Sequence, residues 1–117
     1  MGWKKAQITV LKCMDNRRIQ EEHRIGGYSG PCDAFEVGQQ FVAGWDVPEG
    51  FCAFAYAAIH RDILMIQAGG SLEAVEPEHT AIGCCQDALC PVVFKIERLE
   101  ENLREGDGHG KTEDHGS

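Results

Sequence analysis

Residues 48–70 read PEGFCAFAYAAIHRDILMIQAGG and contain the strongest periodic pattern in the chain. The apolar side chains of this stretch recur at intervals of three and four residues, which is the spacing of one face of an α-helix. They are Cys52, Tyr56, Ile59, Ile63 and Ile66. Pro48 and Glu49 suit a first helical turn, and the glycines at 69 and 70 suit a helix end. The pattern predicts one amphipathic helix, with Cys52 in its first turn.

Shorter segments on both sides of this helix have the alternating or β-branched character of strands. The segment 15–23 is charged and nearly free of apolar residues, so we expect a loop or a solvated turn of helix there. Pro91 stands at the start of the last segment, where a missing N–H is tolerated. The predicted strands are residues 6–11, 40–43, 80–84 and 92–96, the last two joined as a hairpin by a turn over 85–89. The order β-β-α-β-β predicts an α+β domain in which one helix packs on a mainly antiparallel sheet.

The length of 117 residues suits a single domain, which we expect over residues 1–103. Residues 104–117 are mostly glycine, histidine and charged residues with no apolar side chain, so we expect a flexible polar tail. The net charge of −8 argues against nucleic acid or an anionic membrane as a partner. The N-terminus lacks an apolar signal region, and the longest apolar run, 51–59, is too short to span a bilayer. We therefore expect a soluble cytoplasmic protein.

The chain contains six cysteines, at positions 13, 32, 52, 84, 85 and 90. Cytosolic thiols stay reduced, so a set of this size indicates metal ligation or redox chemistry before disulfide bonding. No catalytic triad, carboxylate pair or phosphate-binding loop accompanies them, and the histidines are expected to be solvated. The sequence therefore predicts a type of site and no reaction.

Individual cysteines differ in how well they suit a metal site. Cys52 would lie at a helix N-terminus, where the helix dipole favours a thiolate. Cys32 follows a Gly-Pro turn, and the neighbours Cys84 and Cys85 would face opposite sides of a strand. We predict ligands among Cys32, Cys52, Cys84 and Cys85, with Cys13 and Cys90 as possible further ligands. Four thiolates suit either an iron–sulfur cluster or zinc.

Several short motifs resemble a small uncharacterised family of single-domain proteins, found largely in anaerobic bacteria and archaea, that has no settled activity. The motifs are GPC at 30–32, PEGFC at 48–52, CCxD at 84–87 and PVVFKIER at 91–98, and the likeness covers roughly residues 6–99. The resemblance implies a shared cysteine site formed by Cys32, Cys52 and the Cys84–Cys85 pair. The chain departs from the family pattern at Ala88 and Cys90, where glycine and arginine are expected, and Cys13 lies outside the pattern.

Three functions remain open at this point. The first is a small metal-binding protein, most plausibly with an iron–sulfur cluster, that acts as an accessory subunit of a larger anaerobic enzyme or as a homo-oligomer. The second is a metal-free reactive-thiol protein with Cys52 as a low-pKa thiolate and Cys84–Cys85 as its resolving partner. The third is a protein-binding module whose cysteines are structural.

Overall fold

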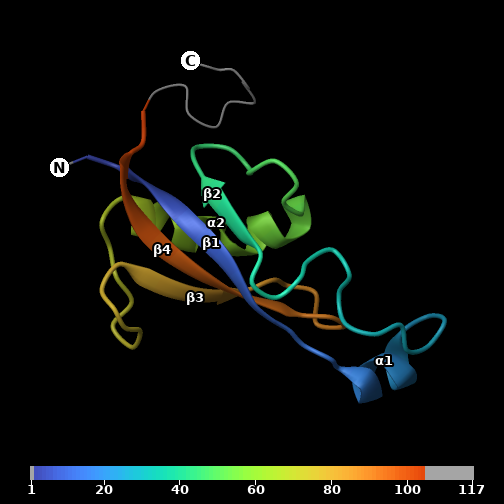
Figure 1. The fold of residues 1–117 in the computed structure, drawn as a ribbon. Helices are drawn as coiled ribbons and strands as arrows, with labels where there is room; N and C mark the ends of the chain where they lie inside the picture. The colour runs from blue at the N-terminus through green and yellow to red at the C-terminus, as the bar shows by residue number, and fades with distance from the viewer. Residues whose placement is uncertain (1, 105–117) are drawn as a thin grey trace.

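The computed structural model describes residues 2–104 and has the predicted α+β architecture (Figure 1). The expected tail lies almost entirely outside the described residues. The elements in chain order are β1 (Lys4–Cys13), α1 (Arg17–His23), β2 (Gln40–Ala43), α2 (Ala53–Gln67), β3 (Thr80–Cys84) and β4 (Val92–Asn102). No helix within these residues is long and apolar enough to cross a membrane.

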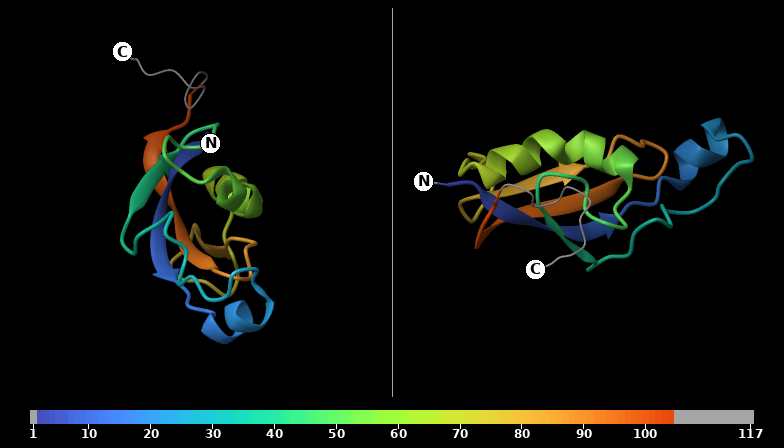
Figure 2. Two further views of the ribbon diagram at one scale, coloured as in Figure 1. Left: turned by 90° about the vertical axis from the view of Figure 1, so that its right-hand side faces the viewer. Right: turned by 90° about the horizontal axis from the view of Figure 1, so that it is seen from above.

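The strands form one four-stranded antiparallel sheet in the order β2-β1-β4-β3. The two longest strands, β1 and β4, pair at its centre, and the short strands β2 and β3 lie at the edges. The two views of Figure 2 show α2 lying across one face of the sheet, while α1 lies beyond the end of β1. The predicted hairpin is confirmed, because β3 pairs with β4 from Thr80↔Glu97 to Cys84↔Val93.

The core lies between α2 and the inner face of the sheet. Phe94 of β4 is fully buried, and its ring packs against Phe35 and Phe51 at centroid distances of 5.2 and 5.4 Å. Eight further core side chains come from alternate positions of β1 and β4 and from every third or fourth position of α2. They are Ala6, Ile8, Val10, Val92, Ile96, Ile59, Ile63 and Ile66. The apolar period of α2 was therefore read correctly from the sequence.

The start of α2 differs from the prediction, because residues 48–51 are not helical. The amide of Phe51 donates to the carbonyl of Pro48 at 3.1 Å, and Gly50 has φ +82°, so this segment is a turn. Cys52 is consequently the N-cap residue, with φ −69° and ψ 122°, and does not lie in the first helical turn. The prediction also left α1 undecided between a loop and a turn of helix, and the structure has seven helical residues there.

Shortening a core side chain of α2 is expected to lower stability modestly. Ile63 is fully buried, so Ile63→Val removes one methylene from a packed site and is expected to lower the free energy of unfolding by about 1 kcal/mol. Ile25 is 96% exposed, and Ile25→Val is therefore the matched control. Urea denaturation of both variants provides the measurement. Equal losses in the two variants would contradict the assignment of Ile63 to the core.

Candidate thiol site

Cys13 is the last residue of β1 and Cys85 directly follows β3, and the two lie on either side of Val92 at one end of the sheet. Cys13 pairs with Val92 in the β1–β4 register. The Cys85 amide donates to the Val92 carbonyl at 3.0 Å, and the Val92 amide donates to Cys85 Sγ at 3.3 Å. Burial, together with the nearby Cys32 and Cys85 side chains, raises the pKa of the Cys13 thiol. These two thiols therefore belong to one local environment.

A β-bulge turns Cys13 toward the inner face of the sheet. Val10 pairs with Phe94 but Lys12 pairs with Val93, so β1 contains one more residue than β4 at this point. In a regular strand, side chains two residues apart face the same side, so Lys12 would face the inner side of the sheet together with Val10. With the extra residue, Leu11 and Lys12 are exposed and Cys13 packs against the core.

Cys32 and Cys90 are brought to the same end by the side chain of Gln20, which is fully buried. Its Nε2 donates to the carbonyls of Gly30 at 2.9 Å and of Leu89 at 2.7 Å. Its Oε1 accepts from the amide of Ser29 at 2.8 Å. We call these three hydrogen bonds the Gln20 bridge. The bridge joins the loop that precedes Cys32 to the turn that precedes Cys90.

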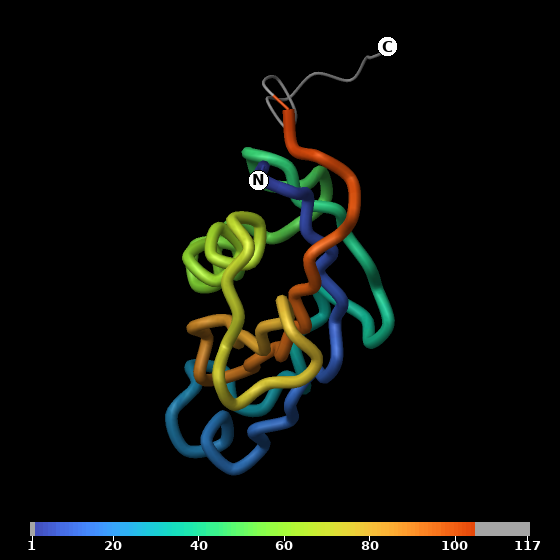
Figure 3. The backbone as a smooth tube through the Cα atoms, turned by 90° about the vertical axis from the view of Figure 1, so that its left-hand side faces the viewer, coloured from blue at the N-terminus to red at the C-terminus, as the bar shows by residue number. Residues whose placement is uncertain are grey.

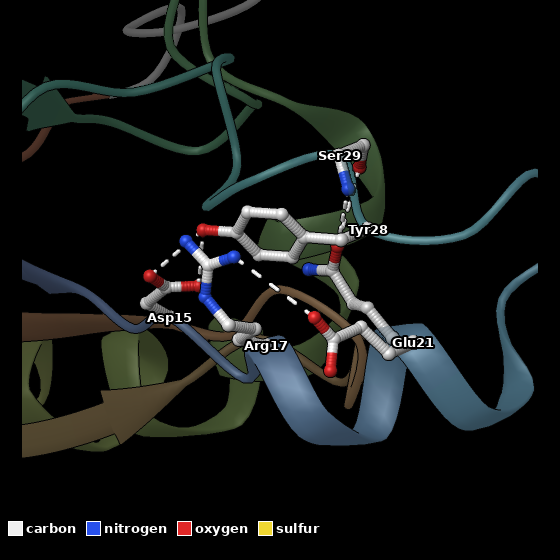
Figure 4. Close-up of polar contacts among 6 residues, drawn as sticks. Asp15, Arg17, Glu21, Tyr28 and Ser29 are labelled. Atoms are coloured by element: carbon white, nitrogen blue, oxygen red, sulfur yellow. Dashed lines mark hydrogen bonds and ion pairs between the residues drawn. The ribbon is translucent and has the colours of Figure 1, made fainter.

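The segment between Cys13 and Cys32 is also held by contacts around α1. Tyr28 donates from its hydroxyl to both carboxylate oxygens of Asp15 at 2.8 Å, and the Arg17 guanidinium lies 3.9 Å from the centroid of the Tyr28 ring (Figure 4). Asn16 Nδ2 donates to the Ala88 carbonyl at 2.7 Å. The amide of Met14 donates to the Pro91 carbonyl at 2.8 Å. Figure 3 shows the resulting proximity of this segment to the turn before β4.

The immediate partners of the sulfur atoms differ. Cys32 Sγ accepts from the Ala34 amide at 3.4 Å. The Cys90 thiol donates to Asp87 Oδ2 at 3.2 Å, and Asp87 Oδ1 accepts from the Leu89 amide at 3.1 Å. Burial raises the pKa of Cys90 to about 12, with further contributions from the hydrogen bond and charge of Asp87 and from the charge and hydrogen bond of Cys32. Cys90 therefore hydrogen bonds to Asp87 and lies near Cys32.

Cys84 and Cys52 differ in position from the other four cysteines, which are Cys13, Cys32, Cys85 and Cys90. Cys84 is exposed, and Cys85 next to it is partly buried against the core, as strand alternation predicts. Burial raises the pKa of Cys84, with a smaller contribution from Cys85. Cys52 packs against the core as the N-cap residue of α2, and its side chain makes no capping hydrogen bond there. We define the thiol cluster as Cys13, Cys32, Cys85 and Cys90.

The thiol cluster is not arranged as a closed metal site. Within residues 2–104, no group of three or more His, Cys, Asp or Glu side chains is placed so that it holds a metal ion. The cluster therefore consists of neighbouring thiols whose sulfur atoms must approach further to share one ion.

The raised pKa of Cys90 predicts slow alkylation in the folded, metal-free protein. At pH 8, iodoacetamide is expected to modify Cys90 about tenfold or more slowly in the native than in the urea-unfolded protein, because the thiolate is the nucleophile. Mass spectrometry after timed quenching provides the rates.

The same shift predicts an alkaline loss of stability. The pKa of Cys90 in the folded protein lies above the ordinary thiol value of 9.0, so folding favours the protonated thiol, and this contribution to stability is lost as the pH rises from 9 toward about 12. The melting temperature of the metal-free protein should fall in that interval. Equal native and unfolded alkylation rates, with a flat pH profile, would contradict this environment for Cys90.

Two features of the site were not predicted from the sequence. Gln20 was not identified, because a glutamine in a short, charged helical segment gives no sign in the sequence that it will be buried. The bulge at Leu11 was not identified either, because a single extra residue is visible only in the pairing of β1 with β4. Comparison with known proteins adds no assignment, since no family model, no curated protein and no solved structure matches the chain.

Proposed function

We propose that this chain is a small cysteine-ligated metalloprotein, with an iron–sulfur cluster as the preferred occupant and zinc as the alternative. The ligands are the four members of the thiol cluster, in place of the set of Cys32, Cys52, Cys84 and Cys85 expected from the sequence. The observation that carries the proposal is that cysteines from three separate segments meet at one end of the sheet. Their meeting depends on a bulge and a buried glutamine, both of which are specific structural devices.

The donor chemistry of the cluster supports this proposal. Cys32 and Cys85 each accept an amide N–H at sulfur, a type of hydrogen bond that stabilises a thiolate and tunes an iron–sulfur centre. Four thiolates satisfy the coordination of zinc or of a four-iron cluster. An iron–sulfur cluster held by these thiols would supply one-electron transfer. Closure around an ion requires rearrangement of the thiols, because the described side chains do not hold one as they stand.

Electrostatics favour metal binding over a nucleophilic thiol. A reactive cysteine needs a lowered pKa, which positive neighbours or a helix N-terminus provide. Every cause that shifts the pKa of Cys13, Cys84 and Cys90 raises it, and none of those causes is a cation. A bound cation would reverse the repulsion among the thiolates. Cys84 and Cys85 also face opposite sides of β3, which makes them poor candidates for a resolving pair.

The role as an accessory subunit is supported by exposed apolar side chains near the site. Ile25 is 96% exposed and Ile19 is 44% exposed, and both lie in the segment between Cys13 and Cys32. A partner that covers this segment would bury apolar surface beside the thiol cluster. We propose a cytoplasmic enzyme subunit as that partner, with a second copy of this chain as the alternative.

Anaerobic purification followed by metal and sulfide analysis tests the proposal. The protein is expected to contain iron and acid-labile sulfide with a visible charge-transfer absorption, or one equivalent of zinc without colour. A double variant, Cys32→Ser with Cys85→Ser, is expected to contain neither, whereas Cys52→Ser with Cys84→Ser should retain the metal. A colourless wild-type protein that also fails to bind added zinc or to accept a reconstituted cluster would overturn the proposal.

A further inference from the structure

We infer that Cys32 and Cys90 form a reversible disulfide when the protein meets a peroxide, and that this bond releases the metal from the thiol cluster. The first part concerns two thiols of the metal-free chain and stands on their proximity. The second part rests on the proposed function. The site would then be a modification site, with a hydroperoxide as the class of oxidant.

The two thiols are held near each other from both sides. The Gln20 bridge fixes the carbonyl of Gly30, two residues before Cys32, and the carbonyl of Leu89, one residue before Cys90, on the same side-chain nitrogen. The Cys32 side chain lies near enough to Cys90 to contribute to the raised pKa of the Cys90 thiol. Because a disulfide needs two β-carbons within a narrow distance, a pair held by the backbone on both sides is the favoured one.

The other cysteines are less suited to pair. Neighbouring Cys84 and Cys85 point to opposite faces, and a bond between them would require a strained ring. The thiol of Cys13 donates to the Phe35 carbonyl at 3.6 Å, and this hydrogen bond would have to break before Cys13 formed a disulfide. Cys52 packs against the core as the N-cap residue of α2. These observations and the Gln20 bridge favour the pair of Cys32 and Cys90.

The reaction takes place in two steps that balance. The Cys32 thiolate attacks one oxygen of hydrogen peroxide, the O–O bond breaks, and sulfenic acid and hydroxide form. The Cys90 sulfur then attacks the Cys32 sulfur, its proton passes to the departing hydroxyl, and water leaves as the S–S bond forms. In total two thiols lose two electrons and two protons, and one peroxide becomes two water molecules. A dithiol reductant reverses the change.

Cys32 suits the first step and Cys90 the second. Cys32 Sγ accepts the Ala34 amide, which stabilises negative charge on sulfur. The Cys90 thiol instead donates a hydrogen bond to Asp87, so the Asp87 carboxylate is placed to relay that proton to the departing hydroxyl when the S–S bond forms. Once formed, the disulfide removes two of the four proposed thiolate ligands, and a disulfide sulfur is a poor metal ligand.

Disulfide mapping of the metal-free protein tests the pair. Cleavage before aspartate separates the relevant cysteines, because Asp15, Asp33, Asp46, Asp62 and Asp87 put Cys13, Cys32, Cys52, the Cys84–Cys85 pair and Cys90 on five different peptides. After stoichiometric hydrogen peroxide and blocking of free thiols, peptide 15–32 is expected to be linked to the peptide that begins at residue 87. The intact protein should lose about 2 Da and retain four of its six thiols.

Variants and metal release complete the test. Cys90→Ser should abolish the crosslinked peptide and leave Cys32 as a sulfenic acid that a dimedone probe captures, whereas Cys84→Ser should leave the crosslink unchanged. Linkage of Cys32 to any other cysteine, or no linkage, would overturn the inference. Protein loaded with zinc should release it to an indicator on oxidation and rebind it after reduction. If the crosslink forms but the reduced protein never binds zinc or a cluster, the disulfide stands and the proposed function fails.

Discussion

Replacing Cys85 by serine is expected to weaken zinc binding on the order of a hundredfold or more, because the change removes one of the four proposed thiolate ligands. Cys85 lies on the inner face of the sheet beside Val92, and its sulfur already accepts a backbone N–H. A serine hydroxyl stays protonated at neutral pH and is a much weaker ligand for zinc than a thiolate. Competition against a chelating indicator measures the dissociation constant.

Cys84→Ser is the matched control for this experiment, because it changes the adjacent residue by the same atom. Cys84 is exposed and belongs to the opposite face of β3, so its replacement is expected to change zinc affinity less than about twofold. A larger loss in Cys84→Ser than in Cys85→Ser would reverse the assignment of the two residues. It would also contradict the register that places Cys85 next to Val92.

Replacing Gln20 by leucine is expected to lower the free energy of unfolding by about 3 kcal/mol, since the change leaves several backbone groups without partners. Leucine has a side chain of similar size, but it cannot form hydrogen bonds with the Gly30 and Leu89 carbonyls or with the Ser29 amide. Because the Gln20 bridge holds the two thiol-bearing loops together, zinc affinity should also fall about tenfold. Urea denaturation and the zinc competition assay measure the two effects.

Gln40→Leu is the control, because Gln40 is exposed on the edge strand β2 and has no part in the site. It should change stability by less than about 0.5 kcal/mol and leave zinc affinity unaltered. If Gln20 positions the two thiols, one further result is expected. In the metal-free protein, the Cys32–Cys90 crosslink should form more slowly in Gln20→Leu under conditions where the variant remains folded. An unchanged crosslinking rate would contradict the positioning role and leave Gln20 with a structural role only.

The fold was largely predictable because its signals are local. The three- and four-residue spacing of Ile59, Ile63 and Ile66 identified α2, and alternation identified the hairpin of β3 and β4 with β3 at its observed bounds. The helix start was wrong by several residues. Pro48 and Glu49 suit a helical turn by composition, whereas Gly50 at φ +82° turns the chain before the helix begins.

The cysteine site was only partly predictable, because its assembly depends on long-range contacts. The opposite orientation of Cys84 and Cys85 follows from strand alternation and is confirmed by their exposure. The closeness of Cys13 to Cys85 depends on the bulge in β1, and that of Cys32 to Cys90 on Gln20. Neither device leaves a pattern in the sequence. The ligand set that we propose therefore differs from the predicted one, because it contains the residues that the sheet brings together and leaves out residues with suggestive neighbours, such as Cys52.

X-ray absorption at the zinc edge tests the central claim most directly, because it counts the sulfur atoms around the ion. For protein reconstituted without oxygen with one equivalent of zinc, we predict four sulfur ligands at about 2.3 Å. The count should fall to three in Cys85→Ser and stay at four in Cys52→Ser and Cys84→Ser. A first shell dominated by nitrogen or oxygen, or a sulfur count that falls on loss of Cys52 or Cys84, would contradict a site formed by Cys13, Cys32, Cys85 and Cys90.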